Sequence, residues 1–312
     1  CSEITLPTGI DKNGRDRTAV CCLSSLNLEK YDEWKDDKMM INDVMRFLDN
    51  VLTDFIDRAP DQFADAKYSA GRERSVGLGV MGFHSYLQKN QIPLESVMSK
   101  VWNKKIFKHI QENVDQASKD LADERGACPD AAEYGFNERF SNKTAIAPTA
   151  SISIICGGAS PGVEPVAANS YTHKTLSGSF NVRNRYLVEL LEKHGKNTDE
   201  VWSGITTNQG SVSHLDFLTD LEKDVFKTAF ELDQKWIIEL SGDRTPHISQ
   251  AQSINLFLAA DVHKKELHKI HFDAWKKGLK SLYYCRSKSI QRAENVNDSK
   301  STDILANVYK QK

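Results

Sequence analysis

The spacing of apolar residues changes along the 312-residue chain, and each change predicts a different element. Near the start, Ile4 and Leu6 alternate with polar neighbours, as do residues 19–23, and this alternation predicts two short strands. The polar stretch Asp11–Asp16 between them predicts a turn. From Ile41 to Phe55, apolar residues recur every three or four positions, which predicts an amphipathic helix packed on a core.

Farther along the chain, strand-like and helix-like patterns alternate. A glycine-rich apolar run covers residues 75–83, and a long helix is predicted from Trp102 to Leu121, with Gly126 placed to end it. Residues 144–169 have no helical spacing and are rich in Ser, Thr, Gly and Pro, so they predict strand and loop. Helical spacing then returns at residues 186–194, 221–240 and 264–279. A last short strand is predicted over residues 281–286.

This alternation predicts the α/β fold class with crossover connections. We expect one continuous domain over residues 1–290, because no repeat and no Pro-, Gly- or Ser-rich linker divides it. After Ser287 apolar residues become scarce, and the polar segment 291–312 predicts a disordered tail.

The charge of the chain is nearly balanced, with 41 Lys and Arg against 43 Asp and Glu and a net charge of −2. No long run of either sign occurs, so we expect no nucleic-acid and no anionic-membrane partner. The mean hydropathy is −0.51, and no window approaches the ~20 consecutive apolar residues of a membrane span. Six cysteines are too few for a disulfide-built secreted fold and no leader is recognisable, so we expect reduced thiols in the cytoplasm.

The first candidate for chemistry is a thiol beside a carboxylate, Cys1 and Glu3. In an extended segment residues i and i+2 face the same way, so both groups would project toward one substrate. The negative charge of the Glu3 carboxylate disfavours the thiolate form of Cys1, so the two groups would make a poor catalytic pair for a hydrolase. The pair suits hydrogen-atom chemistry, in which a neutral S–H becomes a thiyl radical and the carboxylate accepts a hydroxyl proton. The alternative is an exposed chain start without a role.

The second candidate is the pair Cys21 and Cys22. Neighbours on a strand point to opposite faces and a disulfide between them would be strained, so at most one of them faces a site. The remaining cysteines lack metal-ligand spacing, and no two histidines stand four residues apart. We expect no bound metal, and we assign three histidines to the solvated face of a Lys-rich helix: His263, His268 and His271.

Two glycine- or hydroxyl-rich stretches could approach a phosphate. Gly77–Gly82 has the spacing of a dinucleotide fingerprint, but no buried strand precedes it, so we prefer glycines that allow close packing. The other stretch presents hydroxyl and backbone N–H groups in a tight loop, which can bind phosphate without a lysine. It consists of Pro148, Thr149, Ala150, Ser151 and Ile152, and a plain turn is equally compatible with this composition.

Tyr283 and Tyr284 stand side by side after the last predicted helix. Adjacent tyrosines on a strand are usually one core and one surface aromatic. Near an oxidisable thiol, the same two phenols could instead relay a proton-coupled electron.

Taken together, these motifs resemble the C-terminal portion of the large catalytic subunit of class I ribonucleotide reductase, from Cys1 to about Arg292. The resemblance rests on the order and spacing of Cys1-x-Glu3 with Leu6-Pro7-Thr8, Val20-Cys21, Arg74–Gly82, Pro148–Ser153, Gly162-x-Glu164-Pro165, Ser249–Ser253 with Asn255-Leu256, Trp275–Lys280 and Tyr283-Tyr284. It implies part of a ten-stranded α/β barrel, with a central finger loop that carries the radical cysteine. It also implies reduction of ribonucleoside diphosphates to deoxyribonucleoside diphosphates.

The resemblance implies a role for each candidate residue. Cys1 would be the thiyl radical that takes the ribose 3′-hydrogen, and Glu3 the base on the 3′-hydroxyl. Cys21 would be one member of the dithiol that supplies electrons as the 2′-hydroxyl leaves as water. Residues 148–152 would hold the substrate phosphates, and the tyrosine pair would relay the radical.

The resemblance also implies partners. A separate small subunit would carry the metal-based oxidant, so no cofactor is expected in this chain, and an external dithiol of the thioredoxin or glutaredoxin type would be the reductant. The second thiol of the reducing pair and the regions for allosteric control and ATP binding lie upstream in the family. We therefore expect an N-terminal polypeptide of the large subunit as a partner, and a large-subunit dimer. Residues 291–312 contain no cysteine pair of the kind that re-reduces the active site in the family.

Two other interpretations stay open. Cys1 could be the nucleophile of an N-terminal-cysteine hydrolase, with its own α-amine as base. That interpretation leaves the tyrosine pair and the phosphate-like loop unexplained. The chain could also be a non-catalytic, nucleotide-binding remnant.

Overall fold

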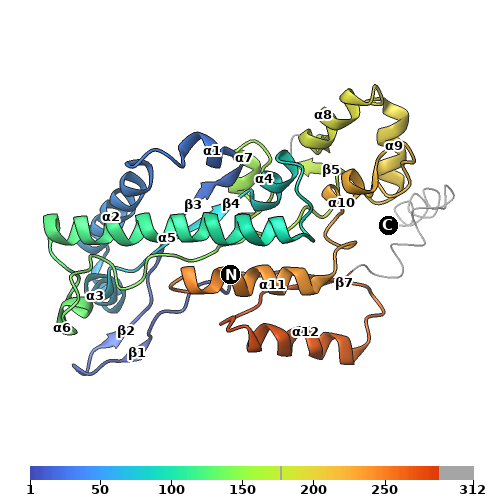
Figure 1. Ribbon diagram of the computed structural model, residues 1–312. Coiled ribbons are helices and arrows are strands. Elements are labelled where there is room, and N and C mark those ends of the chain that lie inside the picture. Colours follow the sequence, from blue (N-terminus) through green and yellow to red (C-terminus); the bar gives the residue numbers. More distant parts are fainter. Residues whose placement is uncertain (176–177, 288–312) are drawn as a thin grey trace, which may run out of the picture.

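The computed structural model describes residues 1–175 and 178–287, so the predicted tail 291–312 lies outside the described residues. Figure 1 shows the helices and strands in their arrangement. The strands are β1 (Gly9–Ile10), β2 (Asp16–Arg17), β3 (Cys22–Asn27), β4 (Val76–Met81), β5 (Ser170–Thr175), β6 (Gly178–Arg183), β7 (Leu256–Leu258) and β8 (Cys285–Ser287). The helices are α1 (Tyr31–Trp34), α2 (Met40–Arg58), α3 (Ala64–Glu73), α4 (Phe83–Lys89), α5 (Val97–Arg125), α6 (Pro129–Glu133), α7 (Ile152–Ile155), α8 (Arg185–Lys193), α9 (Asp199–Thr207), α10 (Asp220–Val225), α11 (Gln234–Arg244) and α12 (Lys264–Lys276), with 3-10 turns at Leu28–Lys30, Asp61–Phe63 and Thr245–His247.

Extended segments lie side by side and parallel, in the order β3, β4, residues 144–146, residues 252–258 and residues 283–287. β3 pairs with β4 and β7 pairs with β8, both in parallel register. Parallel bridges join Leu78 to Thr144 and Ile146 to Gln252. Helices connect each segment to the next, which confirms the α/β class with crossover connections. Among the described strands this array is open and does not close into a barrel.

The glycines of β4 make the close approach of its neighbours possible. A Cβ atom on Gly77 would lie 2.4 Å from Cδ2 of Leu23, and one on Gly79 would lie 2.3 Å from the carbonyl oxygen of Ala145. The clash at Gly79 is with backbone, so only glycine fits there, whereas a larger residue at Gly77 would have to displace the end of the Leu23 side chain. The close-packing interpretation of Gly77–Gly82 is therefore confirmed.

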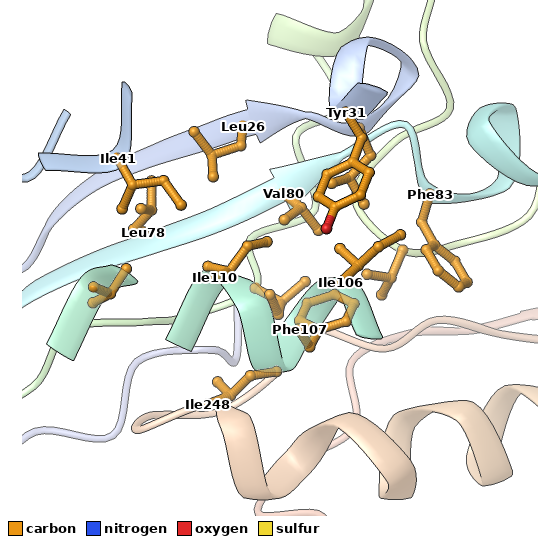
Figure 2. Packing of buried hydrophobic residues seen from close by; sticks show 14 of the residues in the cluster. Leu26, Tyr31, Ile41, Leu78, Val80, Phe83, Ile106, Phe107, Ile110 and Ile248 are labelled. Atoms are coloured by element: carbon orange, nitrogen blue, oxygen red, sulfur yellow. The ribbon is translucent and has the colours of Figure 1, made fainter. Parts of the chain in front are cut away.

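The long helix α5 lies across the array and forms the centre of the core (Figure 1). The Ser96 side chain accepts the Ser99 N–H and starts the helix, and Gly126, at φ +86°, ends it as predicted. Figure 2 shows how one face of α5 meets the strands, with Ile106 and Ile110 lying close to Leu78 and Val80. The apolar stripe of α2 packs against α5 in the same core, as its three-to-four-residue spacing predicts.

A second, smaller core joins α8, α9 and α10. The single helix predicted over residues 221–240 is wrong, because the chain forms α10 and α11 there. Thr219 and Glu222 form a capping box at the start of α10, and the Asp233 side chain accepts the Lys235 N–H at the start of α11. Cap residues therefore divided a segment whose apolar spacing was continuous.

The turn predicted at Asp11–Asp16 is present and joins β1 to β2.

Three predicted strands need correction. Ile4 and Leu6 do not lie in a strand, because their segment is held by side chains more than by a ladder. The strand predicted over residues 19–23 begins only at Cys22, as β3. The last strand, expected over residues 281–286, begins only at Cys285. Among the helices of the described residues, none is both long and apolar enough to cross a membrane.

Candidate active site

The first residues of the chain lie along the segment 250–253. The Ala251 N–H donates to the Glu3 carbonyl at 2.9 Å, and the Ser2 N–H donates to Oγ of Ser253 at 2.9 Å. The hydroxyl of Ser281 donates to the carbonyl of Ser2 at 2.7 Å. Segments from both ends of the chain thus meet at the middle of the parallel array.

Glu3 is buried and Cys1 is exposed, although they are only two residues apart. The Ser253 hydroxyl donates to Oε2 of Glu3, which gives the buried carboxylate a partner. Cys1 keeps an accessible thiol beside it. The structure fixes the place of the predicted base, while the pairing of both groups on one substrate stays a prediction.

Cys21 lies just before β3, with its sulfur accepting from Nε2 of Gln250 at 3.2 Å. Burial raises the pKa of the Cys21 thiol to about 11, although the hydrogen bond from Gln250 acts in the opposite direction; the charges of Cys22 and Glu3 also raise this pKa. Cys21 is therefore a protonated thiol at neutral pH. Cys22 packs against the main core instead, so the two sulfurs have different surroundings, as strand alternation predicts.

Gln250 is the residue that connects these groups, and the sequence reasoning gave it no role. Its Nε2 donates to the Cys21 sulfur and to the Val76 carbonyl, at 3.2 and 3.3 Å. Its Oε1 accepts the Thr5 N–H at 3.1 Å. Gln250 is buried in the bend before residues 252–258, and a buried amide needs partners on both of its ends.

Tyr283 and Tyr284 lie immediately before β8 and next to this cluster. Their ring centroids are 4.0 Å apart, at an angle of 38° between the ring planes. The hydrogen-bonded Tyr284 hydroxyl, followed by burial and the charge of Glu3, raises the pKa of Tyr283. The rings are in contact with each other, unlike the usual arrangement of one core and one surface aromatic.

The predicted phosphate loop begins two residues after Ile146, whose N–H donates to the Ala251 carbonyl at 3.1 Å. Thr149 has φ +53°, which is unusual for a β-branched residue, and its Oγ1 accepts the Gly162 N–H at 2.7 Å. The backbone N–H groups of Ala150, Ser151 and Ile152 donate no hydrogen bond to any described residue. These three exposed residues therefore have N–H groups that are available to bind an anion.

No metal site is visible in the described residues, where no group of three or more His, Cys, Asp or Glu side chains is placed to hold a metal ion. His263 caps α12 by accepting the Lys265 N–H. His268 and His271 lie exposed on the same helix.

Comparisons with known proteins place the chain in a family. Residues 1–139 and 130–285 match the family described as "Ribonucleotide reductase, barrel domain". The large subunit of ribonucleoside-diphosphate reductase from Invertebrate iridescent virus 6 is 51% identical over 303 residues, which are 96% of this chain and 31% of that protein. The corresponding protein of Invertebrate iridescent virus 3 is 45% identical over 305 residues, 97% of this chain and 47% of that protein.

A solved structure agrees with these sequence matches. The class Id ribonucleotide reductase alpha subunit of Actinobacillus ureae is 40% identical and superposes with a TM-score of 0.84, over 93% of this chain and 52% of that one. The chain thus spans between about a third and a half of the relatives that it matches. The chain belongs to the ribonucleotide reductase family and contains sequence of its α/β barrel domain.

Proposed function

We propose that this chain is the C-terminal part of the catalytic barrel of a ribonucleoside-diphosphate reductase large subunit. Assembled with an N-terminal polypeptide, it would reduce ribonucleoside diphosphates to deoxyribonucleoside diphosphates, the precursors of DNA. One observation carries the proposal: Glu3, Cys21 and Tyr283 are each hydrogen-bonded to the segment 250–254, through Ala251, Gln250 and Ile254 respectively, so that they lie near one another.

In the proposed reaction, Cys1 acts as a thiyl radical. Its sulfur takes the 3′-hydrogen of the ribose, so that an S–H bond forms as a C–H bond breaks, and Glu3 accepts the proton of the 3′-hydroxyl. The 2′-hydroxyl leaves as water with a proton from the reducing dithiol. Cys21 and a thiol of the N-terminal polypeptide supply two electrons and a second proton, which goes to C2′, and become a disulfide. Cys1 then returns its hydrogen to C3′ and becomes a thiyl radical again, while Glu3 returns its proton to the 3′-oxygen.

The surroundings of Cys21 support its role in this scheme. A reducing thiol that must donate a proton has to carry that proton at working pH. The pKa of Cys21, raised to about 11, keeps the thiol protonated until the substrate needs it.

The loop 148–152 is proposed to hold the substrate phosphates. Its free N–H groups and the exposed hydroxyl of Ser151 supply donors without a positive side chain. Thr149 acts mainly as a support for the loop, because its buried side chain already accepts from Gly162.

The remaining partners follow from the family. We propose that the tyrosine pair relays the radical from a separate small subunit carrying a metal-based oxidant, which leaves this chain without a cofactor of its own. An external dithiol of the thioredoxin or glutaredoxin type would re-reduce the site. A large-subunit dimer, allosteric control with ATP binding, and a cytoplasmic location complete the proposal.

The family favours this function over the two alternatives. A hydrolase with Cys1 as nucleophile has no use for the Glu3–Ser253 contact or for the contacting tyrosines. A non-catalytic remnant has no use for a protonated thiol bonded to Gln250.

Reconstitution tests the proposal directly. The chain would be mixed with the upstream part of a large subunit and with a small subunit from an iridescent-virus relative, and deoxynucleotide formation from ribonucleoside diphosphates would be measured. We expect product only when all three polypeptides and a dithiol are present. Assembly of a stable complex that forms no product would contradict the proposal.

A further inference from the structure

The tyrosine pair lies at an irregularity in the parallel pairing with residues 254–256. In a regular parallel pair, one residue makes two hydrogen bonds to the neighbouring strand. Its N–H donates to a carbonyl of that strand, and its own carbonyl accepts from the N–H that lies two residues farther along the same neighbouring strand. Here the Tyr283 N–H donates to Ile254 at 2.8 Å, but the Leu256 N–H donates to the carbonyl of Tyr284 at 2.9 Å. Two residues therefore take the place of one, which is a β-bulge.

The bulge explains why the two rings touch. Consecutive residues of a regular strand point to opposite faces, which would separate the rings of Tyr283 and Tyr284. An inserted residue changes the direction of the following side chain, and the ring centroids come to 4.0 Å.

The bulge leaves one backbone donor without a ladder partner, and Asn255 supplies the missing acceptor. Its Oδ1 accepts the Tyr284 N–H at 3.1 Å, and its Nδ2 donates to Oε2 of Glu164 at 2.5 Å. Asn255 is only 1% exposed, so its amide orientation is set by these two contacts. Glu164 therefore decides which end of the amide meets the tyrosine backbone.

Glu164 in turn is tied to the loop 148–152. Its N–H donates to the Pro161 carbonyl at 3.1 Å, which closes a turn around Gly162, and Gly162 donates to Thr149. Gly162 has φ +50°, and a Cβ atom there would lie 2.9 Å from the carbonyl of Ala147, so the turn has little freedom to move.

We propose that Asn255 and Glu164 are positioning residues for the tyrosine pair: Asn255, oriented by Glu164, holds the bulge that keeps the Tyr283 and Tyr284 rings in contact. The inference rests on the proposed function only in giving the ring contact a use in radical transfer. The contact itself can be measured without turnover.

The test exchanges the polarity of the Asn255–Glu164 contact. In Asn255→Asp one oxygen still accepts from Tyr284, but the other faces the Glu164 carboxylate and repels it. In the double variant Glu164→Gln/Asn255→Asp the new amide donates to the new carboxylate, which restores the contact with its direction reversed. Asn197→Asp is the matched control, because Asn197 also accepts with Oδ1, from Trp202 at 2.7 Å, and donates with Nδ2, to Glu192 at 3.2 Å, away from the site.

Two properties of the reconstituted complex are measured for each variant: the ¹⁹F NMR signal and the steady-state kinetics of turnover. The ¹⁹F signal comes from 3-fluorotyrosine in place of Tyr284 and reports the position of this ring. We expect Asn255→Asp to shift this signal and to lower kcat about tenfold or more with KM nearly unchanged, as for a lost hydrogen bond to a charged group. The double variant should return both readouts toward the parent values, and Asn197→Asp should change neither.

A parent-like ¹⁹F signal in Asn255→Asp, or no recovery in a folded double variant, would overturn the inference. If Asn255→Asp does not assemble, Glu164→Ala at the half-buried end of the contact decides instead, and an unshifted signal there overturns the inference equally. If the parent complex forms no deoxynucleotide, the proposed function fails while the ¹⁹F series still decides the role of Asn255.

Discussion

The side-chain amide of Gln250 joins the sulfur of Cys21, at 3.2 Å, to the backbone of Thr5, whose N–H it accepts at 3.1 Å. One buried side chain therefore sets the distance between the segment that carries Cys1 and Glu3 and the thiol proposed to reduce the substrate. In the proposed radical reaction these groups act on one sugar ring, so the contact would serve the chemistry as well as the fold.

Replacing Gln250 by Ala should weaken this junction. The substitution leaves the Thr5 N–H and the carbonyl of the buried Val76 short of a partner, and we expect a loss of about 1–3 kcal/mol in the free energy of unfolding of the assembled complex. Chemical denaturation measures it, with Gln116→Ala on the exposed face of α5 as a control expected within about 0.5 kcal/mol of the parent. Equal stabilities would show that Gln250 is not needed at the junction.

Most of the fold could be predicted from the sequence, because periodicity and caps are local signals. The stripe from Ile41 to Phe55 predicted α2, and Gly126 marked the end of α5. The division of residues 221–240 was missed, because Thr219 and Asp233 are cap residues within a continuous apolar spacing. The strand β6 is largely exposed, so no buried face produced an apolar pattern there.

The candidate site was predicted less completely. Short motifs and a family resemblance indicated Cys1, Glu3 and Cys21, but their spatial relationship depends on contacts across about 250 residues of sequence. Gln250 and Asn255 were missed as functional residues for this reason. The bulge at the tyrosine pair cannot be read from the sequence either, because it is a property of two paired strands.

The thiol of Cys21 should react slowly with an alkylating agent near neutral pH. Because its pKa is raised to about 11, its rate should increase about tenfold for each pH unit from 7 to 10 and level off only near 11. In the urea-unfolded chain the rate should level off near the ordinary thiol pKa of about 8.5. Iodoacetamide labelling followed by peptide mass spectrometry gives both profiles. Identical profiles would show that the folded site does not protect the proton.

Replacing Ser151 by Ala should weaken the binding of a ribonucleoside diphosphate to the complex. We expect a cost of about 0.5–1.5 kcal/mol for one hydrogen bond, rising to ~3 if the hydroxyl meets the phosphate charge directly. Calorimetry with the diphosphate and with the unphosphorylated nucleoside measures the difference, and Ser203→Ala on α9 is the exposed control. Nucleoside and diphosphate binding equally well to the parent would exclude a phosphate loop at this position.

The phenols of the tyrosine pair should be needed for turnover and dispensable for folding. Tyr283→Phe and Tyr284→Phe each keep the ring but remove the O–H, and a phenyl ring cannot pass a hydrogen equivalent at an accessible potential. Deoxynucleotide formation should vanish in both variants, while the melting temperature and small-subunit binding stay at parent values. Tyr134→Phe, at an exposed position, is the control and should stay active. Substantial activity in either test variant would show that the two tyrosines are ordinary strand aromatics without a role in radical transfer.

The most direct test of the whole account is the rate of deoxynucleotide formation by Cys1→Ser in the reconstituted complex. A hydroxyl hydrogen is far harder to abstract than a thiol hydrogen, so we expect no product, substrate affinity equal to the parent, and full activity in the exposed control Cys156→Ser. Turnover of the Cys1→Ser complex at the parent rate would contradict thiyl-radical chemistry at Cys1 and with it the proposed function.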